Sequence, residues 1–276
     1  MPMESFIQLH GRRFAYLDFG GPGPVLLALH GHFGRGWIFA PLASALAGRC
    51  RVVALDQRGH GLSDNGGDTT PDAYVADAAA FLRVLDLAPA VVLGHSMGGA
   101  IAFLLARRHP ELVSALVIAD MTVLNQEPET RPVLDVTGWP RRSSSRRALK
   151  DAIEAQGIPD ASYFLDSAAR FDDGWGLLFD TDDMMASQHA LTGDFSAQWA
   201  ASAQPALLLR GGDSFILTAA TAQRMAAERP NTQLVEMPGC GHWLHADAPD
   251  VFAEEVGSFL DRIRAVPDIL GSRATT

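Results

Sequence analysis

The sequence predicts an α/β fold with a mostly parallel, eight-stranded sheet that is flanked by helices and interrupted by one insertion. Three observations predict it. Short β-rich runs alternate with helical patterns in the first part of the chain, the alternation stops near Met121, and it resumes near Pro205. With 276 residues, 47% of them hydrophobic and 20% charged, the chain has the composition of a globular protein with a sizeable core.

Each strand is expected where a short apolar or β-branched run is bounded by turn residues. The predicted strands are 6–9, 13–18, 25–29, 51–55, 90–93, 115–118, 205–209 and 233–237. His10-Gly11-Arg12 separates the first two, which predicts a hairpin at an antiparallel edge. The predicted helices of the core are 36–47, 71–87, 98–109, 219–229 and 249–266.

The break in the alternation predicts two parts. Residues 1–120 and 205–276 are expected to form the core, and 121–204 a helical lid inserted between strands six and seven. Helical stretches at 145–155, 161–170 and 182–191 support the lid. An insertion at this point would lie over the carboxyl ends of the strands, where open α/β sheets bind ligands.

Charge and cysteine content narrow the partners. Lys and Arg number 22 against 32 Asp and Glu, and the net charge of −10 disfavours nucleic acids and anionic membranes. We therefore expect a small-molecule substrate. The amino terminus has no basic segment followed by an apolar run, which predicts a cytoplasmic protein. Cys50 and Cys240 lack metal-ligand spacing and cannot staple a secreted scaffold, so neither a metal nor another cofactor is expected.

A glycine-bracketed serine predicts nucleophilic catalysis. Residues 94–98 read Gly-His-Ser-Met-Gly and directly follow the apolar run 90–93, as in a strand that ends in a tight turn. Glycine two residues to either side of Ser96 leaves room for neighbouring backbone in a strained turn. The helix that follows would direct its N–H groups at the position of a developing oxyanion.

A serine hydroxyl needs a base within hydrogen-bond reach, itself oriented by a third group. His242 is the best candidate among nine histidines. It alone combines a late position, a loop after a predicted strand and flanking glycines.

With Ser96, His242 and this strand order, the chain resembles the α/β-hydrolase superfamily over nearly its whole length, as a lid-containing, esterase-like serine hydrolase. The motifs that carry the resemblance, besides the serine turn, are His-Gly-His-Phe-Gly at 30–34, Asp-Gln-Arg-Gly-His-Gly-Leu-Ser at 56–63 and Gly-His-Trp at 241–243. The resemblance implies an oxyanion hole made by the backbone N–H groups of His32 and Met97. It implies structural roles for Arg58 and His60.

The triad acid has two candidates. Members of the superfamily usually carry it after the lid in a Gly-x-x-Asp pattern, but here that position, counted from Gly211, is Ser214, and Asp213 falls one residue early. A shift of one residue can redirect a side chain completely. Asp120 ends the strand before the lid, where a minority of relatives carry the acid. We favour Asp120 and keep Asp213 as the alternative.

The lid is rich in methionine and aromatic residues, which favours a largely apolar substrate. The expected substrate contacts are Phe33, His95, Met121, Trp139, Phe164, Met184 and Trp243. The basic run 141–147 predicts a solvated helix start; its alternative is a dock for a phosphopantetheine-bearing acyl carrier.

These residues and the resemblance predict hydrolysis of an ester-like bond of the carboxylesterase or lactonase type, through an acyl-enzyme. A serine nucleophile argues against dehalogenase or epoxide-hydrolase chemistry, for which related proteins use an aspartate. Thioesterase, carbon–carbon bond hydrolase and cofactor-free perhydrolase or acyltransferase activities share the same machinery. The alternative of another class is a non-catalytic protein that binds a small ligand.

Overall fold

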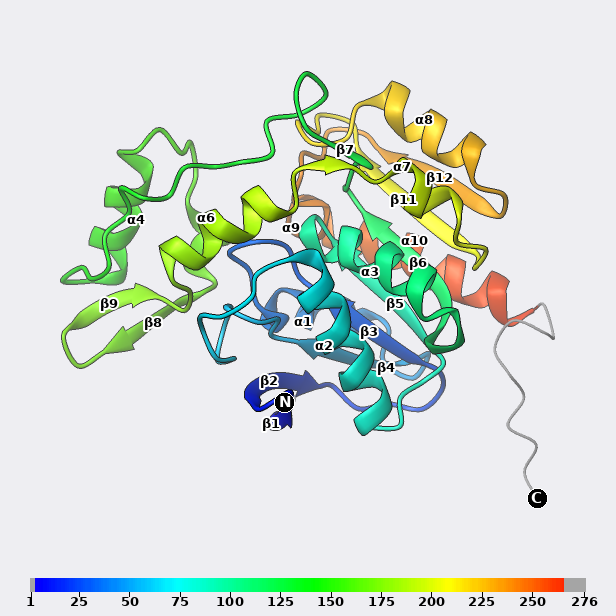
Figure 1. Cartoon of the computed structure of the whole chain (residues 1–276), viewed down its shortest axis with the longest axis horizontal. Coiled ribbons are helices and arrows are strands. Elements are labelled where there is room, and N and C mark those ends of the chain that lie inside the picture. Colours follow the sequence, from blue (N-terminus) through cyan, green and yellow to red (C-terminus); the bar gives the residue numbers. More distant parts are fainter. Residues whose placement is uncertain (1–2, 266–276) are drawn as a thin grey trace.

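The computed structural model describes residues 3–265 (Figure 1). Its main sheet has eight strands in the order β1-β2-β4-β3-β5-β6-β11-β12, which confirms the predicted fold class. The strands are β1 (Met3–Leu9), β2 (Arg12–Asp18), β3 (Val25–Leu29), β4 (Arg51–Leu55), β5 (Ala90–His95), β6 (Val113–Ala119), β11 (Ala206–Gly211) and β12 (Thr232–Met237). The end of the predicted core segment, 266–276, lies outside the described residues.

The β1–β2 hairpin forms an antiparallel edge, and β2 pairs antiparallel with β4. The remaining neighbours in the sheet are parallel. Every residue of β5 and β6 is buried. Parallel strands covered on both faces favour such continuous apolar runs.

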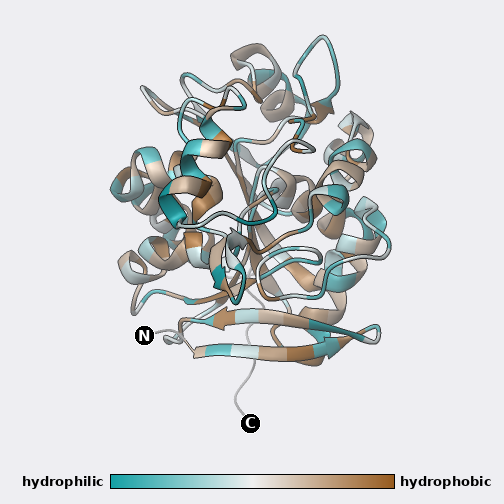
Figure 2. Ribbon diagram, turned by 90° about the vertical axis from the view of Figure 1, so that its left-hand side faces the viewer, coloured by the Kyte–Doolittle hydropathy of each residue, from teal (hydrophilic) through white to brown (hydrophobic). Residues whose placement is uncertain are grey.

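Helices cover both faces of the sheet (Figure 2). One face packs against α2 (Pro71–Val84), α3 (Met97–Arg108) and α8 (Ala219–Glu228). The other packs against the 3₁₀ helix Gly36–Phe39, α1 (Ala40–Ala45), α9 (Leu244–Asp247) and α10 (Pro249–Arg264). Successive side chains of a strand point to opposite faces, so Leu27 joins the first core and Leu26 the second.

The segment between β6 and β11, called the insertion below, mixes helices with the small hairpin β8–β9 and a two-stranded pairing of β7 with β10. Its elements are β7 (Leu124–Asn125), α4 (Arg146–Glu154), α5 (Ser162–Leu165), β8 (Ala168–Phe171), β9 (Gly174–Leu177), α6 (Thr181–Ala190), β10 (Gly193–Asp194) and α7 (Ser196–Ala200). The insertion contains helices at all three predicted helical stretches, together with short strands that the sequence did not indicate. The helix expected over 161–170 ends at Leu165, because residues 168–171 form strand β8 instead and pair with β9. Gly174 follows the turn between these strands with a φ of +136°, which favours glycine.

The insertion has its own apolar core, to which Phe33 from the loop after β3 also contributes. Side-chain oxygens fix the starts of two of its helices. Ser145 accepts a hydrogen bond from Ala148 N at the start of α4, and Asp180 accepts from Asp182 N at the start of α6. The division into core and lid stays a prediction. None of the helices within residues 3–265 combines the length and apolar character needed to cross a bilayer.

Candidate active site

Ser96 lies in a strained turn between β5 and α3. Its φ of +53° and ψ of −124° are unfavourable for a side chain with a Cβ. Two glycines make this turn possible. A Cβ atom at Gly94 would lie 2.0 Å from the carbonyl oxygen of Gly98, and one at Gly98 would lie 2.1 Å from that of Leu29. The turn leaves Ser96 half-buried at the carboxyl end of the sheet.

His242 and Asp120 form a hydrogen-bonded pair, with Nδ1 of the histidine 2.8 Å from Oδ2 of the aspartate. Asp120 is completely buried and His242 is 6% exposed. Asp120 Oδ1 also accepts a hydrogen bond from Gly211 N at 2.9 Å, and Oδ2 accepts one from Ser214 Oγ at 2.5 Å. A carboxylate acceptor requires the histidine proton on Nδ1, which leaves the Nε2 lone pair available as a base.

Asp213 occupies a different position. Its side chain is exposed, and its backbone N–H donates to Cys240 O at 2.9 Å. Ser214, one residue further along, instead directs its hydroxyl at Asp120. The turn after β11 thus places residue 214, not residue 213, beside the histidine–aspartate pair.

Ser96 and His242 line the same cavity, which has a volume of about 590 Å³. It lies between the core and the insertion and is walled mainly by aromatic and aliphatic side chains, as small-molecule sites usually are. The lining residues are His32, Phe33, His95, Ser96, Arg131, Pro132, Val133, Leu134, Ile158, Pro159, Asp160, Tyr163, Phe164, Gln188, Phe215, Ile216, His242 and Trp243.

The loop after β3 holds His32 at the edge of this cavity. Tyr163 OH donates to His32 O at 3.2 Å, and His32 Nε2 lies 2.9 Å from Ser187 Oγ. Burial lowers the pKa of His32 to about 3, so its ring is neutral at neutral pH. Met97 is the first residue of α3, and its N–H therefore has no acceptor within the helix. The roles of both amides in an oxyanion hole stay predictions.

His95 joins the serine turn to the loop that carries His242. Its Nε2 donates to His242 O at 2.9 Å, and burial holds its pKa well below the ordinary value. The His245 ring meets it edge to face, with ring centroids 4.7 Å apart, and burial lowers the pKa of His245 to about 3. The His242 ring packs against that of His95, with ring centroids 4.7 Å apart. No group of histidine, cysteine and acidic side chains within residues 3–265 has the arrangement of a metal site.

Residues 25–255 match the sequence pattern described as the alpha/beta hydrolase family. The chain belongs to the α/β-hydrolase family. It is 30% identical over 260 residues to the sn-1-specific diacylglycerol lipase ABHD11 of Mus musculus, covering 88% of this chain and 83% of that protein. It is 28% identical over 254 residues to the 2-(acetamidomethylene)succinate hydrolase of Mesorhizobium japonicum, covering 87% and 89% of the two chains.

Solved structures agree with this family. The crystal structure of E-2-(acetamidomethylene)succinate hydrolase superposes with a TM-score of 0.83 at 24% identity, over 95% of this chain and 100% of the other, which shows a shared fold. An α/β hydrolase from Novosphingobium aromaticivorans superposes with a TM-score of 0.77 at 27% identity, over 95% and 99% of the two chains. This α/β hydrolase is therefore a hydrolytic enzyme with the usual core of its family.

The structure brings four of the expected substrate contacts to the cavity wall. These are Phe33, His95, Phe164 and Trp243. The other three are not in its lining, and a role for them in substrate binding stays a prediction. Met121 packs in the main core, whereas Trp139 and Met184 pack in the core of the insertion. These three side chains bury apolar surface. An apolar residue that packs in a core and one that lines a cavity look the same in the sequence.

Several lining residues of this α/β hydrolase were not expected from its sequence. Tyr163, Phe215, Gln188 and Arg131 come from the insertion or from the turn after β11. None lies in a motif. These residues share only one feature that the sequence could show: they belong to segments that the predicted architecture places above the strand ends.

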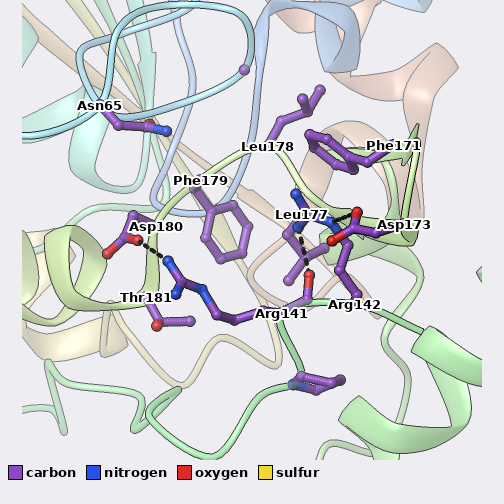
Figure 3. Close-up of a pocket in the computed structure, with 12 residues that line it drawn as sticks. Asn65, Arg141, Arg142, Phe171, Asp173, Leu177, Leu178, Phe179, Asp180 and Thr181 are labelled. Carbon is purple, nitrogen blue, oxygen red and sulfur yellow. Dashed lines mark hydrogen bonds and ion pairs between the residues drawn. The ribbon is translucent and has the colours of Figure 1, made fainter.

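A second cavity of about 390 Å³ contains part of the basic run (Figure 3). Arg141 lies 3.6 Å from Asp180, and Arg142 Nε donates to Asp173 at 2.6 Å. Outside the cavity, Arg147 lies 3.9 Å from Asp151. Acidic neighbours thus already compensate these cations, which favours a solvated surface over the acyl-carrier dock.

Proposed function

We propose that this α/β hydrolase cleaves an ester-like bond of a small, largely apolar substrate through Ser96, His242 and Asp120. The observation that carries the proposal is the 2.8 Å hydrogen bond between His242 and the buried Asp120, at the wall of a cavity that Ser96 also lines. A nucleophile, a base and an orienting acid on three different loops are what acyl transfer by serine requires.

In the proposed reaction, Ser96 Oγ attacks the carbonyl carbon while His242 Nε2 takes its proton. Asp120 holds the imidazole tautomer and stabilises the imidazolium that forms. The N–H groups of His32 and Met97 donate to the oxyanion. Collapse releases the alcohol, which receives the proton from His242 and leaves an acyl-enzyme. Water then repeats the sequence, releases the acid and restores Ser96.

Two features support an ester as the substrate class. The cavity wall is predominantly apolar, which suits an acyl chain or an aromatic alcohol. One relative is a diacylglycerol lipase, an ester hydrolase by its name, while another is a 2-(acetamidomethylene)succinate hydrolase. Lactones, thioesters and carbon–carbon bonds could be cleaved by the same groups, but no specific contact favours them. A cytoplasmic location and a small-molecule partner remain part of the proposal.

Active-site labelling tests the mechanism. A fluorophosphonate probe should label the wild-type protein and fail to label Ser96→Ala, whereas Ser44→Ala, an exposed serine on α1, should label normally. Absence of labelling in the folded wild-type protein would favour a non-catalytic binding protein. The substrate class is then tested with para-nitrophenyl esters of increasing chain length beside lactones and thioesters. Faster turnover of a thioester or lactone than of every ester would contradict the proposed class.

A further inference from the structure

Arg131 brings an uncompensated positive charge to the cavity that contains Ser96. Among the described residues that line this cavity, Arg131 and Asp160 are the two with a permanently charged side chain. Asp160 is already engaged, because it accepts hydrogen bonds from Ser162 Oγ at 2.6 Å and from Lys150 Nζ at 3.4 Å. Within residues 3–265, no hydrogen bond or ion pair engages the Arg131 guanidinium.

This lack of a partner is unusual in the chain. Arginines on the surface are mostly paired, as Arg83 is with Glu111 and Arg108 with Asp72. Arg107 and Arg170 likewise have neither a hydrogen bond nor an ion pair among the described residues, but neither belongs to the lining of the catalytic cavity. Arg131 therefore stands apart in combining an unused guanidinium with a place in this wall.

Hydrogen bonds on both sides hold the segment that carries Arg131. On one side, Thr130 Oγ1 donates to Phe215 O at 3.3 Å. On the other, Gln188 clasps the backbone of Leu134, accepting from its N–H at 2.8 Å and donating to its carbonyl oxygen at 3.0 Å. Thr130 and Gln188 are both buried. The backbone on either side of Arg131 is thus held against the turn after β11 and against α6, and the exposed Arg131 side chain lines the cavity.

We propose that Arg131 binds a carboxylate of the substrate, so that the enzyme acts on esters that are apolar around the scissile bond and anionic at one end. This inference rests on the proposed function, which locates the reacting carbonyl at Ser96. A ligand that fills an apolar cavity removes water from a guanidinium in its wall, and an anion compensates that loss. Arginine matches a carboxylate with two parallel N–H donors, which lysine cannot supply.

The test compares pairs of esters of similar size in which one member carries a carboxylate. For a carboxylate on the acyl side, the pair is para-nitrophenyl hydrogen glutarate and the same ester with an isopropyl group in place of the carboxylate. For a carboxylate on the alcohol side, the pair is para-acetoxybenzoate and para-isopropylphenyl acetate. Wild-type enzyme should have the higher kcat/KM for the anionic member of at least one pair, and the pair identifies which side of the substrate is anionic.

Substitution of Arg131 should weaken that preference for the anionic ester. In Arg131→Gln, the ratio of kcat/KM for the anionic over the neutral ester should fall by about tenfold to a hundredfold, mainly through KM, as expected for loss of a charge-assisted hydrogen bond. Arg131→Lys should retain part of the ratio as a point charge. Arg147→Gln, an exposed arginine on α4 outside the cavity, should leave the ratio unchanged. An unchanged ratio in Arg131→Gln, or a wild-type preference for the neutral ester in both pairs, overturns the inference.

Failure of the proposed function gives a different result. It would appear as folded protein with no turnover of any ester that depends on Ser96. Carboxylate binding is read without turnover by calorimetric titration of Ser96→Ala with monomethyl glutarate. Binding that disappears in Ser96→Ala combined with Arg131→Gln supports the inference, and absence of binding to Ser96→Ala contradicts it.

Discussion

Asp120 reaches His242 because of how three strand ends meet. In the sheet, β11 lies between β6 and β12. Asp120 comes directly after β6 in the sequence, and His242 lies in the loop after β12. The loop approaches closely because residue 211 is glycine: a Cβ there would lie 2.1 Å from Gly241 O. A carboxylate on β6 can therefore cross the end of β11 and meet the histidine.

Loss of the Asp120 charge should abolish most activity. We expect Asp120→Asn to lower kcat by about 10⁴-fold, because an amide cannot hold the Nδ1–H tautomer or stabilise an imidazolium. Steady-state ester hydrolysis measures this, with circular dichroism as the check on folding. The kcat of Asp213→Asn should stay within about twofold of wild type, because the side chain is exposed and substitutions at the surface usually have small effects. Collapse of kcat in Asp213→Asn alone would show that the acid is Asp213.

Ser214 offers a second site for the acid. Its Oγ lies 2.5 Å from the Asp120 oxygen that in turn lies 2.8 Å from His242 Nδ1. A carboxylate at position 214 should therefore reach the imidazole once Asp120 is neutral. We predict that Asp120→Asn combined with Ser214→Asp has a kcat at least about tenfold higher than that of Asp120→Asn alone. This gain is a small part of the effect of a triad acid.

The matched control for this relocation is Asp120→Asn combined with Ser214→Asn, which adds the same volume without the charge. It should recover nothing. Equal activity in the two double variants would mean that a carboxylate at 214 does not serve His242, and that the acid must be on β6.

The strands of the core were predictable because burial on both faces leaves a simple signal. Strands β3 and β4 have the predicted bounds 25–29 and 51–55, and the serine turn follows β5 as expected. The insertion was less predictable. Its hairpin β8–β9 is short and half-buried, so a run such as 161–170 has no clear period in the sequence.

The candidate site divides in the same way. Ser96, His242 and the two acid candidates, Asp120 and Asp213, each follow a strand and could be proposed from the sequence, because the strand ends of a parallel sheet gather at one edge. The cavity wall could not be selected. Whether Met184 packs inside the insertion or Tyr163 faces the cavity depends on how helices of the insertion settle on the core, and composition alone does not encode that choice.

The serine turn should tolerate no side chain at Gly98. A Cβ there would lie 2.1 Å from the backbone oxygen of Leu29, which the neighbouring strand holds in place. We expect Gly98→Ala to lower the free energy of unfolding by more than about 3 kcal/mol, because both α3 and β3 must shift. Urea denaturation followed by circular dichroism measures this. Gly138→Ala is the control: its Cβ would meet only the mobile end of Gln156 at 3.0 Å, so its stability should change little. Wild-type stability in Gly98→Ala would contradict the account of the turn.

Stability of the folded chain should fall steeply in acid because several histidines are buried as neutral rings. Burial lowers the pKa of His30 to about 4, and that of His32, His60 and His245 to about 3, from an ordinary value of 6.5. Below pH 6.5 these histidines bind protons in the unfolded chain but not in the folded chain. The free energy of unfolding that is present above this pH is therefore lost as the pH falls toward 3 to 4. Burial raises the pKa of Asp56, which opposes part of the loss at the acid end.

The slope of this loss identifies the groups responsible. Each buried histidine should contribute about 1.4 kcal/mol of unfolding free energy per pH unit inside the window. Removing one in His60→Gln should therefore reduce the slope measured by urea denaturation between pH 6 and pH 5 by about that amount, even if the substitution lowers stability uniformly. His189→Gln, at an exposed position on α6, should leave the slope as in wild type. Glutamine does not titrate, so His60→Gln cannot bind the proton that the unfolded wild-type chain takes up at position 60. A wild-type slope in His60→Gln would therefore show that the acid sensitivity comes from other groups.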